Sequence, residues 1–359
     1  MKREDAFDLY TDYLLSSTKL VTCTGLSAAL NGSLKHDYLS DFLNQLDMDS
    51  ATYWKLIKPF VRKIETPNAY LSIDDTHLEK PYTDENELIC PHWDHSKRRT
   101  ITGINMINFL LSSFREEDFI NCPVAYDLVR KTEHYTDEKG KKKRRSEITK
   151  NELVREKLAQ LTFQNQIQFK YILFDIWFAS AENMTFIHKK LKKIFICPLK
   201  DNRLVALSLK EKLAGEFQSV WKLNFESGRV HKVWLKGVSF PLNLTKEVFT
   251  NQDGSTGERY LVSNDTDMSF GDITSHYQKR WKVEELHKSL KSNVNIEKSP
   301  TQKEVSQSNH IFCSLMAFIK LEKLKIKQKM NHFALKNHLY IKMIKTAMAE
   351  INRLTDVQL

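Results

Sequence analysis

The sequence is poor in the residues that mark disordered, fibrous or disulfide-stabilised proteins. Its 359 residues include only 10 glycines and 8 prolines, too few for a collagen-like or low-complexity chain. The five cysteines lie far apart without a C-x-x-C pair, which predicts buried thiols in a reducing cytosol rather than a disulfide framework. No apolar run approaches the roughly 20 residues of a membrane helix, and the charged start MKREDAFDLY is unlike a signal peptide. We therefore expect a soluble cytoplasmic protein, long enough for two or three domains.

Positive charge is in excess. Basic residues outnumber acidic ones by 55 to 45, which gives a net charge of +10. This balance suits a polyanionic partner such as nucleic acid, although many basic proteins bind nothing acidic. Residues 137–147, DEKGKKKRRSE, concentrate the charge. Such a run is typical of a solvated, mobile loop, and in a nucleic-acid-binding protein it can grip phosphate, so both interpretations stay open.

Helical spacing marks both ends of the chain. Over residues 1–66, LSAALNG and SLKHDYLSDFL predict two helices around an Asn31-Gly32 turn, and SATYWKLIKPFVRK predicts a third. A helix-turn-helix DNA-binding region and a plain helical bundle fit this pattern equally well. Helical spacing resumes at about residue 270 and continues to the C-terminus. There Phe312, Leu315, Phe318 and Leu321 share one face, which favours core packing.

The middle of the chain alternates strands and helices. AYLSIDDTH (69–77), RRTITGINMINFLLSS (98–113), CPVAYDLV (122–129) and QFKYILFDIWF (168–178) predict strands. Residues 147–166 predict a helix, and about 194–265 form a strand-rich stretch. This order is typical of a mixed α/β protein with helices covering a sheet.

Four acidic residues are candidates for metal chemistry. Asp74 and Asp75 end the first strand, Asp175 follows the apolar run YILF, and Glu284 lies in a charged helix. Carboxylates at strand ends project from the rim of a sheet, where several can converge. Two Mg²⁺ ions held about 3.5–4 Å apart by such groups can cleave a phosphodiester bond. A single strand-end aspartate is more often a turn former or cap, but Asp175 follows a buried run and is the stronger candidate.

The charged helix is HYQKRWKVEELHKSLKSN, residues 276–293. Placed on one helical wheel, six of its residues share an arc of about 100°: Tyr277, Arg280, Trp281, Glu284, Lys288 and Lys291. Val283, Leu286 and Leu290 gather on the other side as an apolar stripe. A solvent face with a Glu284–Lys288 ion pair explains part of the pattern. A face that binds a phosphate backbone explains the aromatic rings among the cations, and composition alone favours neither interpretation.

The spacing Tyr277-x2-Arg280-x3-Glu284-x6-Lys291 resembles the Tyr-Arg-Glu-Lys signature of bacterial insertion-sequence transposases with a DDE triad, the group often called IS-four type. IDDT (73–76), FDIWFAS (174–180) and WDHSKRRTITGIN (93–105) are similar to other segments of that family. The strong likeness covers about residues 70–295.

The resemblance implies an RNase H-like catalytic domain over residues 67–300, with a β-rich insertion at about 194–265. A helical DNA-binding region (1–66) would precede it and a helical C-terminal region (301–359) would follow. The triad would be Asp75, Asp175 and Glu284, holding two Mg²⁺ ions for which Mn²⁺ can substitute. Asp74 is the less favoured first aspartate, because the family usually has the catalytic residue directly before the Thr.

The resemblance also implies DNA contacts from Tyr277, Arg280, Trp281, Lys288 and Lys291. In hairpin-forming relatives a Trp of the insertion stabilises a flipped base, and Trp234 is the candidate here. Whether this protein forms a hairpin is left open.

The function implied is cut-and-paste transposition. The partners would be double-stranded DNA, as terminal inverted repeats and as target, and a second protomer in a synaptic complex at the bacterial nucleoid. Two alternatives are a domesticated or inactive DNA-binding relative and an RNase H-like nuclease without strand transfer. The complete set of carboxylates argues against the first, and the Tyr-Arg-Glu-Lys spacing against the second.

Overall fold

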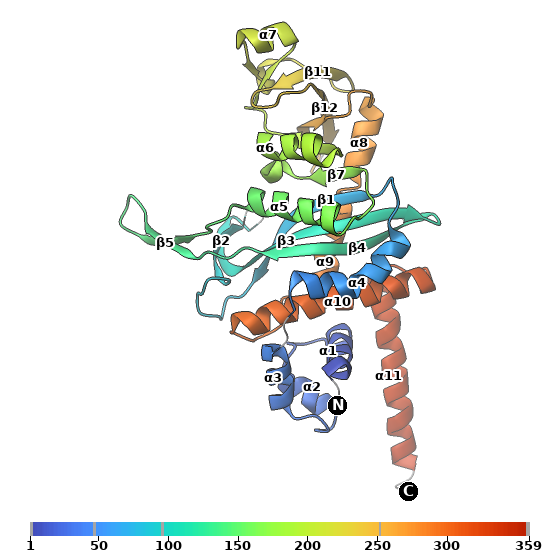
Figure 1. Cartoon of the computed structure of the whole chain (residues 1–359). Helices are drawn as coiled ribbons and strands as arrows, with labels where there is room; N and C mark the ends of the chain where they lie inside the picture. The colour runs from blue at the N-terminus through green and yellow to red at the C-terminus, as the bar shows by residue number, and fades with distance from the viewer. Residues whose placement is uncertain (1–2, 46–47, 95–96, 251–252, 357–359) are drawn as a thin grey trace. The chain divides into compact units, whose positions relative to one another are not determined.

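The computed structural model describes residues 3–45, 48–94, 97–250 and 253–356 (Figure 1). Packing divides the chain into two compact units. The first joins Met1–Tyr53, His77–Ile104 and Glu285–Leu359, and the second joins Trp54–Thr76 and Asn105–Glu284. Each unit is therefore assembled from segments that are distant in the sequence.

The first unit is mainly helical. Its elements are α1 (Arg3–Ser16), α2 (Cys23–Ala29), α3 (His36–Gln45), β2 (Cys90–Asp94), the start of β3 (Arg99–Arg115), the end of α9 (Trp281–Ser292), α10 (Glu304–Gln328) and α11 (His332–Asp356). The predicted turn after α2 is confirmed, since Asn31 and Gly32 both have left-handed φ angles, of 51° and 71°. α1 and α3 pack against α10, as in a helical bundle. The four α10 residues predicted to face a core, Phe312, Leu315, Phe318 and Leu321, are buried.

A buried histidine ties the N- and C-terminal helices of this unit together. His310 is 0% exposed, and its Nε2 lies 3.1 Å from the carbonyl oxygen of Ile296. Because a carbonyl only accepts, Nε2 carries the proton and Nδ1 accepts from the Tyr10 hydroxyl at 3.0 Å. Burial, with the charge of Lys80 adding, lowers the pKa of His310 to about 3. The ring is therefore neutral in the folded protein.

The second unit carries most of the sheet. Its elements are most of α4 (Ser50–Ile64), of β1 (Tyr70–Glu79) and of β3, then β4 (Asp118–Leu128), β5 (Glu133–Thr136), β6 (Lys142–Arg145), α5 (Lys150–Ala159), β7 (Tyr171–Phe174), α6 (Ala181–Thr185), β8 (Ile194–Leu199), β9 (Leu204–Ala206), α7 (Leu209–Ala214), β10 (Gln218–Ser219), β11 (Val230–Leu235), β12 (Leu242–Thr250), β13 (Thr256–Ser263), α8 (Phe270–Gln278) and the first turn of α9. The strand order is β10-β9-β11-β12-β13-β8-β7-β1-β3, with β4 beside β3. β1, β7 and β8 run parallel, whereas β13 pairs with β8 in the antiparallel sense. The predicted mixed α/β fold, with a strand-rich stretch from 194 to 265, is confirmed.

The centre of the sheet brings two acidic positions to the same level. All four residues of β7, YILF, are buried, as expected for a strand covered on both faces. In the parallel pair, Ile73 of β1 lies opposite Phe174 of β7. Asp74 and Asp175 directly follow these two residues, so the register alone places both at one point of the sheet.

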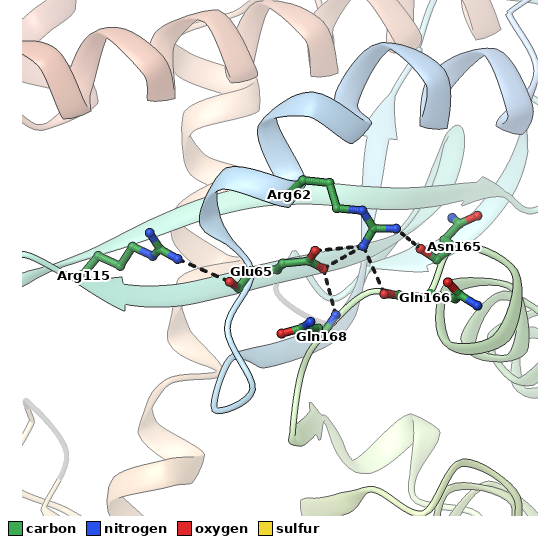
Figure 2. A network of polar contacts seen from close by, with 6 residues as sticks. All are labelled: Arg62, Glu65, Arg115, Asn165, Gln166 and Gln168. Carbon is green, nitrogen blue, oxygen red and sulfur yellow. Dashed lines mark hydrogen bonds and ion pairs between the residues drawn. The ribbon is translucent and has the colours of Figure 1, made fainter.

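A polar network holds the segment that leads into β7 (Figure 2). Arg62 of α4 donates to the Glu65 carboxylate at 2.8 Å and to the carbonyl oxygens of Asn165 and Gln166 at 2.7 and 3.0 Å. Glu65 in turn accepts from the amide of Gln168 at 2.9 Å. The network thus joins the end of α4 to the loop before β7, the strand that positions Asp175.

Residues 276–293 do not form the single helix that the wheel assumed. α8 ends at Gln278 and α9 begins at Trp281. Between them the amide of Arg280 bonds to the carbonyl of Tyr277 at 2.9 Å, and Lys282 bonds to Lys279 at 3.1 Å. These bonds reach back three residues instead of four, which tightens the chain and breaks the regular helix.

The basic run at 137–147 is also ordered differently from a loop. Residues 142–145 form β6, which pairs with β5 in an antiparallel hairpin separate from the main sheet. None of the helices in the described part of the chain has the length and apolar character that a membrane span requires. Four cysteines are buried, namely Cys90, Cys122, Cys197 and Cys313.

Candidate active site

Asp74 lies at the centre of a partly buried acidic cluster in the second unit. The residue is 7% exposed, and its Oδ2 accepts from Arg280 Nη1 at 3.0 Å. Arg280 also donates to Glu284 Oε1 at 3.3 Å, and carboxylate oxygens of Asp74 and Glu284 lie within 4.8 Å of each other. The structure therefore brings together an aspartate of the first strand and the glutamate of α9.

The pKa of Asp74 is raised to about 8. Burial is the main cause, and the nearby charges of Asp175, Glu284 and Asp75 add to it, although Arg280 opposes them. The Arg280 guanidinium lowers the pKa of Asp74 but does not offset the effect of burial.

Asp175 caps the short helical turn that follows β7. Its Oδ1 accepts from the amide of Trp177 at 2.9 Å. Burial raises the pKa of Asp175 to about 6, and the charge of Asp75 contributes in the same direction. Asp175 is thus electrostatically coupled to the first-strand aspartates, as expected from its position beside β1.

Asp75 points to the other face of β1, because successive side chains of a strand alternate. Its Oδ2 accepts from Asn105 Nδ2 and from Lys150 Nζ, each at 2.6 Å. Lys150 is the first residue of α5, whose start is fixed by a capping box between Thr149 and Glu152. Sequence reasoning missed Asn105 and Lys150, although Asn105 ends the family-like segment 93–105.

The donor set of the cluster fits a divalent cation. Asp74, Asp175 and Glu284 offer only carboxylate oxygens, the ligands that hard cations such as Mg²⁺ prefer. Crowded, partly buried carboxylates raise each other's pKa, and a bound cation removes that cost. Asp74 and Glu284 could therefore share a metal ion, with Asp175 next to Asp74 in the register of the sheet.

The ring of Tyr277 packs against Arg280, the cation of the site. It is 4% exposed and packs in a core cluster with Leu173, Ile196 and Ile273. Arg280 and Arg259 lie over its ring at 5.7 and 4.8 Å from the centroid. Burial raises the pKa of Tyr277 to about 12. The ring thus forms a platform for two guanidinium groups.

The other side chains predicted to contact DNA lie in α9, after the break in the helix. Trp281 is 62% exposed. In the first unit, Lys288 is exposed with its Nζ 5.1 Å from the Phe333 ring centroid. Lys291 Nζ donates to the carbonyl of His77 at 2.8 Å and pairs with Glu297 at 3.0 Å. Trp281 and Lys288 are therefore accessible, whereas Lys291 already makes internal contacts.

A cavity of about 720 Å³ opens beside Asp175 in the second unit. Its lining includes aromatic and basic side chains, namely Trp221, Phe249, Tyr260, Lys200, Lys246 and Arg259, together with the carboxylates of Asp175, Asp201 and Glu258. Trp221 is 57% exposed. Trp234, the candidate from the sequence, lies half-buried in β11 opposite Ala206 of β9. The sequence offered only the short run VWK as a signal for Trp221.

Two family models match the chain. One, described as DDE superfamily endonuclease, matches residues 1–209, and the other, described as Transposase DDE domain, matches residues 132–319. Each spans more than half of the chain. No curated protein sequence matches it.

Proposed function

Because the chain belongs to the DDE superfamily of endonucleases and transposases, we propose that it cuts the ends of a mobile DNA element and joins them to target DNA. The families it matches are enzymes that act on DNA and use divalent metal ions. The acidic cluster carries the proposal for this chain, since carboxylate oxygens of Asp74 and Glu284 lie within 4.8 Å of each other and the charge of Asp175 acts on Asp74.

The metal in this proposal is Mg²⁺, as two ions, with Mn²⁺ able to substitute. Bound there, the ions would activate the attacking oxygen and stabilise the leaving oxygen of the phosphodiester. Asp74, Asp175 and Glu284 would hold them. A bound cation would favour the charged form of Asp74, which burial and the neighbouring carboxylates disfavour when no ion is bound.

The choice of Asp74 over Asp75 rests on contacts. Asp74 shares Arg280 with Glu284, whereas one oxygen of Asp75 is held by Asn105 and Lys150. Asp75 has in its favour that it directly precedes Thr76, as in the family motif. We assign Asp74 as the metal ligand and Asp75 as a positioning residue.

The basic and aromatic groups would hold the DNA. The Arg280 guanidinium would contact a phosphate near the cut, and the Tyr277 ring packs against Arg280. Trp281 and Lys288 would contact DNA through their exposed side chains, with Lys291 nearby in sequence. A displaced base would enter the cavity beside Asp175 and stack on Trp221, which lines the cavity and is 57% exposed.

Transposition adds partners. The substrates would be inverted-repeat ends and target DNA at the bacterial nucleoid, and two protomers would hold the two ends in a synaptic complex. The helices of residues 1–66 would recognise the ends. In this scheme a 3′-OH released by the first cut attacks the opposite strand and later the target.

The test uses the DNA that flanks the gene. Wild-type protein is incubated with those flanks and Mg²⁺, with a target plasmid added in a second reaction. Cleavage followed by joined products supports transposition. Cleavage without joined products would reduce the proposal to a nuclease, and binding without cleavage would reduce it to a DNA-binding relative.

A further inference from the structure

The second half of α11 is exposed on every side. Each position from residue 341 to residue 353 is exposed, whereas Leu335 in the first half of the helix is 2% exposed. In Figure 1 this part of α11 extends away from the other helices of the first unit. At 1.5 Å per residue the exposed half is about 20 Å long. It is therefore a long helical surface that the rest of the first unit does not cover.

Polar contacts fix the first turns of α11 to the helices before it. His332 Nε2 lies 2.7 Å from Glu322 Oε2 of α10, and His332 Nδ1 lies 2.9 Å from Ser289 Oγ of α9. Lys336 Nζ donates to the carbonyl oxygen of Asn293 at 2.9 Å. The helix is thus anchored at its start, and its exposed half continues from that anchored part without a break.

An apolar stripe runs along the exposed half. Ile341, Ile344, Met348 and Ile351 follow one another at intervals of three, four and three residues and are 51–61% exposed. On a helical wheel the four side chains share an arc of about 80°. Such spacing is the a/d pattern through which two helices pack side by side. Contiguous exposed apolar surface of this kind is typical of a site that binds another protein.

Charges of opposite sign border the stripe. Met343 and Ala347 widen it to an arc of about 160°, with Lys345 just beyond one edge and Glu350 just beyond the other. In a parallel pair about a two-fold axis, unlike edges face each other, so the cation of one helix faces the acid of the other. In an antiparallel pair like charges would meet. Glu350 also pairs with Arg353 at 2.8 Å, but such exposed pairs are weak.

We infer that the exposed half of α11 packs in parallel against the same segment of a second copy of this chain. The stripe and its charged edges are complementary to themselves, as a two-fold interface requires. Four side chains from each helix form an interface below about 1,200 Å², the class of transient pairs. The inference rests on the proposed transposition, in which two protomers hold the two DNA ends, and it names the surface that joins them.

Sedimentation velocity of the full chain tests the pairing, at protein concentrations of about 1–300 µM. Ile344→Gln with Met348→Gln changes the stripe, and Lys342→Gln with Thr346→Gln changes the opposite face of the same helix. Glutamine is a good helix former, so α11 should remain helical in both variants. We expect a concentration-dependent dimer for the wild type and the control, and a Kd raised about tenfold or more in the stripe variant.

Disulfide trapping tests the parallel orientation. In a parallel pair residue 341 of one copy lies beside residue 341 of the other, close to the α-carbon separation of about 4.4–6.8 Å that a disulfide needs. In an antiparallel pair that aligns the two stripes, residue 341 lies beside residue 351 instead. Ile341→Cys should therefore form a covalent dimer on mild oxidation, whereas Lys342→Cys on the opposite face and the wild type should not.

A wild type that stays monomeric at every concentration, or equal dimerisation in the two glutamine variants, would overturn the inference. Equal yields of covalent dimer from the two cysteine variants would overturn the parallel pairing. Circular dichroism of each variant checks that the helix content is unchanged.

Cleavage and joining of the flanking DNA separate this inference from the proposed function. A chain that dimerises through the stripe but never cuts keeps the pairing and loses the transposase. A chain that cuts and joins DNA but stays monomeric keeps the transposase and loses the pairing.

Discussion

Arg280 and Asp74 form an ion pair of 3.0 Å between residues 206 positions apart in the chain. Arg280 is the cation of a site that otherwise consists of carboxylates. Arg280 contacts Glu284 as well, so a single guanidinium serves two acids. The pKa of Asp74 nevertheless remains raised to about 8, chiefly by burial.

The raised pKa of Asp74 leads to a prediction about the metal-free protein. The folded-state pKa of Asp74, about 8, exceeds its ordinary value of 3.8, so the folded state retains a proton that the unfolded state releases. The contribution of Asp74 to stability is complete below pH 3.8 and is lost as the pH rises to about 8. Asp74→Asn should therefore melt higher than the wild type at pH 8 and above, by about 2–4 °C for each kcal/mol gained.

Thermal melting of both proteins in EDTA, from pH 5 to pH 9, tests this. The gap should narrow towards acid, and Mg²⁺ should raise the melting temperature of the wild type more than that of the variant. A difference in melting temperature that does not change with pH would contradict the raised pKa of Asp74.

The two faces of β1 predict different losses for neighbouring aspartates. Asp74→Asn removes a proposed metal ligand and should reduce cleavage by at least about 100-fold. Asp75→Asn keeps a side chain of the same size beside Asn105 and Lys150, so it should reduce cleavage less than Asp74→Asn does. Metal affinity measured by calorimetry separates the roles, since only Asp74→Asn should weaken it strongly. The reverse order in both measurements would restore Asp75 as the ligand favoured by the family motif.

The network of Figure 2 should matter for stability rather than for chemistry. Arg62→Ala leaves Glu65 without its guanidinium and the carbonyls of Asn165 and Gln166 without their donor. We expect a loss of about 1–3 kcal/mol in the free energy of unfolding. Arg115→Ala is the matched control, because it removes only a 3.4 Å bond to the Glu65 carbonyl. Urea unfolding that shows equal losses for the two variants would refute the importance of the network.

His310 predicts acid sensitivity in the first unit. Its folded-state pKa of about 3 lies below the ordinary 6.5, so stability is complete above pH 6.5 and falls as the unfolded state takes up a proton. The loss is about 1.4 kcal/mol for each pH unit between 6.5 and 3. His310→Gln can still donate to the Ile296 carbonyl and accept from Tyr10, but it has no proton to gain. Its stability, followed by urea unfolding, should fall less steeply with acid than that of the wild type, and an identical slope would rule out this role of His310.

The features that could be predicted from the sequence are those set by local pattern. YILF is a fully apolar run, so its strand character and the position of Asp175 at its end follow directly. The Asn31-Gly32 turn and the core face of α10 are of the same kind. The mixed α/β fold follows from the order of such segments.

The features that could not be predicted depend on contacts between distant segments. A wheel placed Tyr277 with the polar residues, but the chain breaks after Gln278 and Tyr277 packs in the core. Which of Asp74 and Asp75 meets Arg280 depends on the register of β1 in the sheet. The basic run folds into a hairpin because Asp137 binds turn amides and Lys143. The spacing of residues along the sequence does not predict the helix break, the register of β1 or the hairpin.

Metal-dependent DNA cleavage by the wild type and by Asp175→Asn tests whether the acidic cluster is the active site. Asp175 lies at the end of the buried strand β7, and Asn keeps its bond to the Trp177 amide, so the fold should survive. We expect cleavage by the wild type with Mg²⁺, none with EDTA, and a loss of at least about 100-fold in the variant at unchanged DNA affinity. Cleavage by Asp175→Asn at the wild-type rate would contradict it.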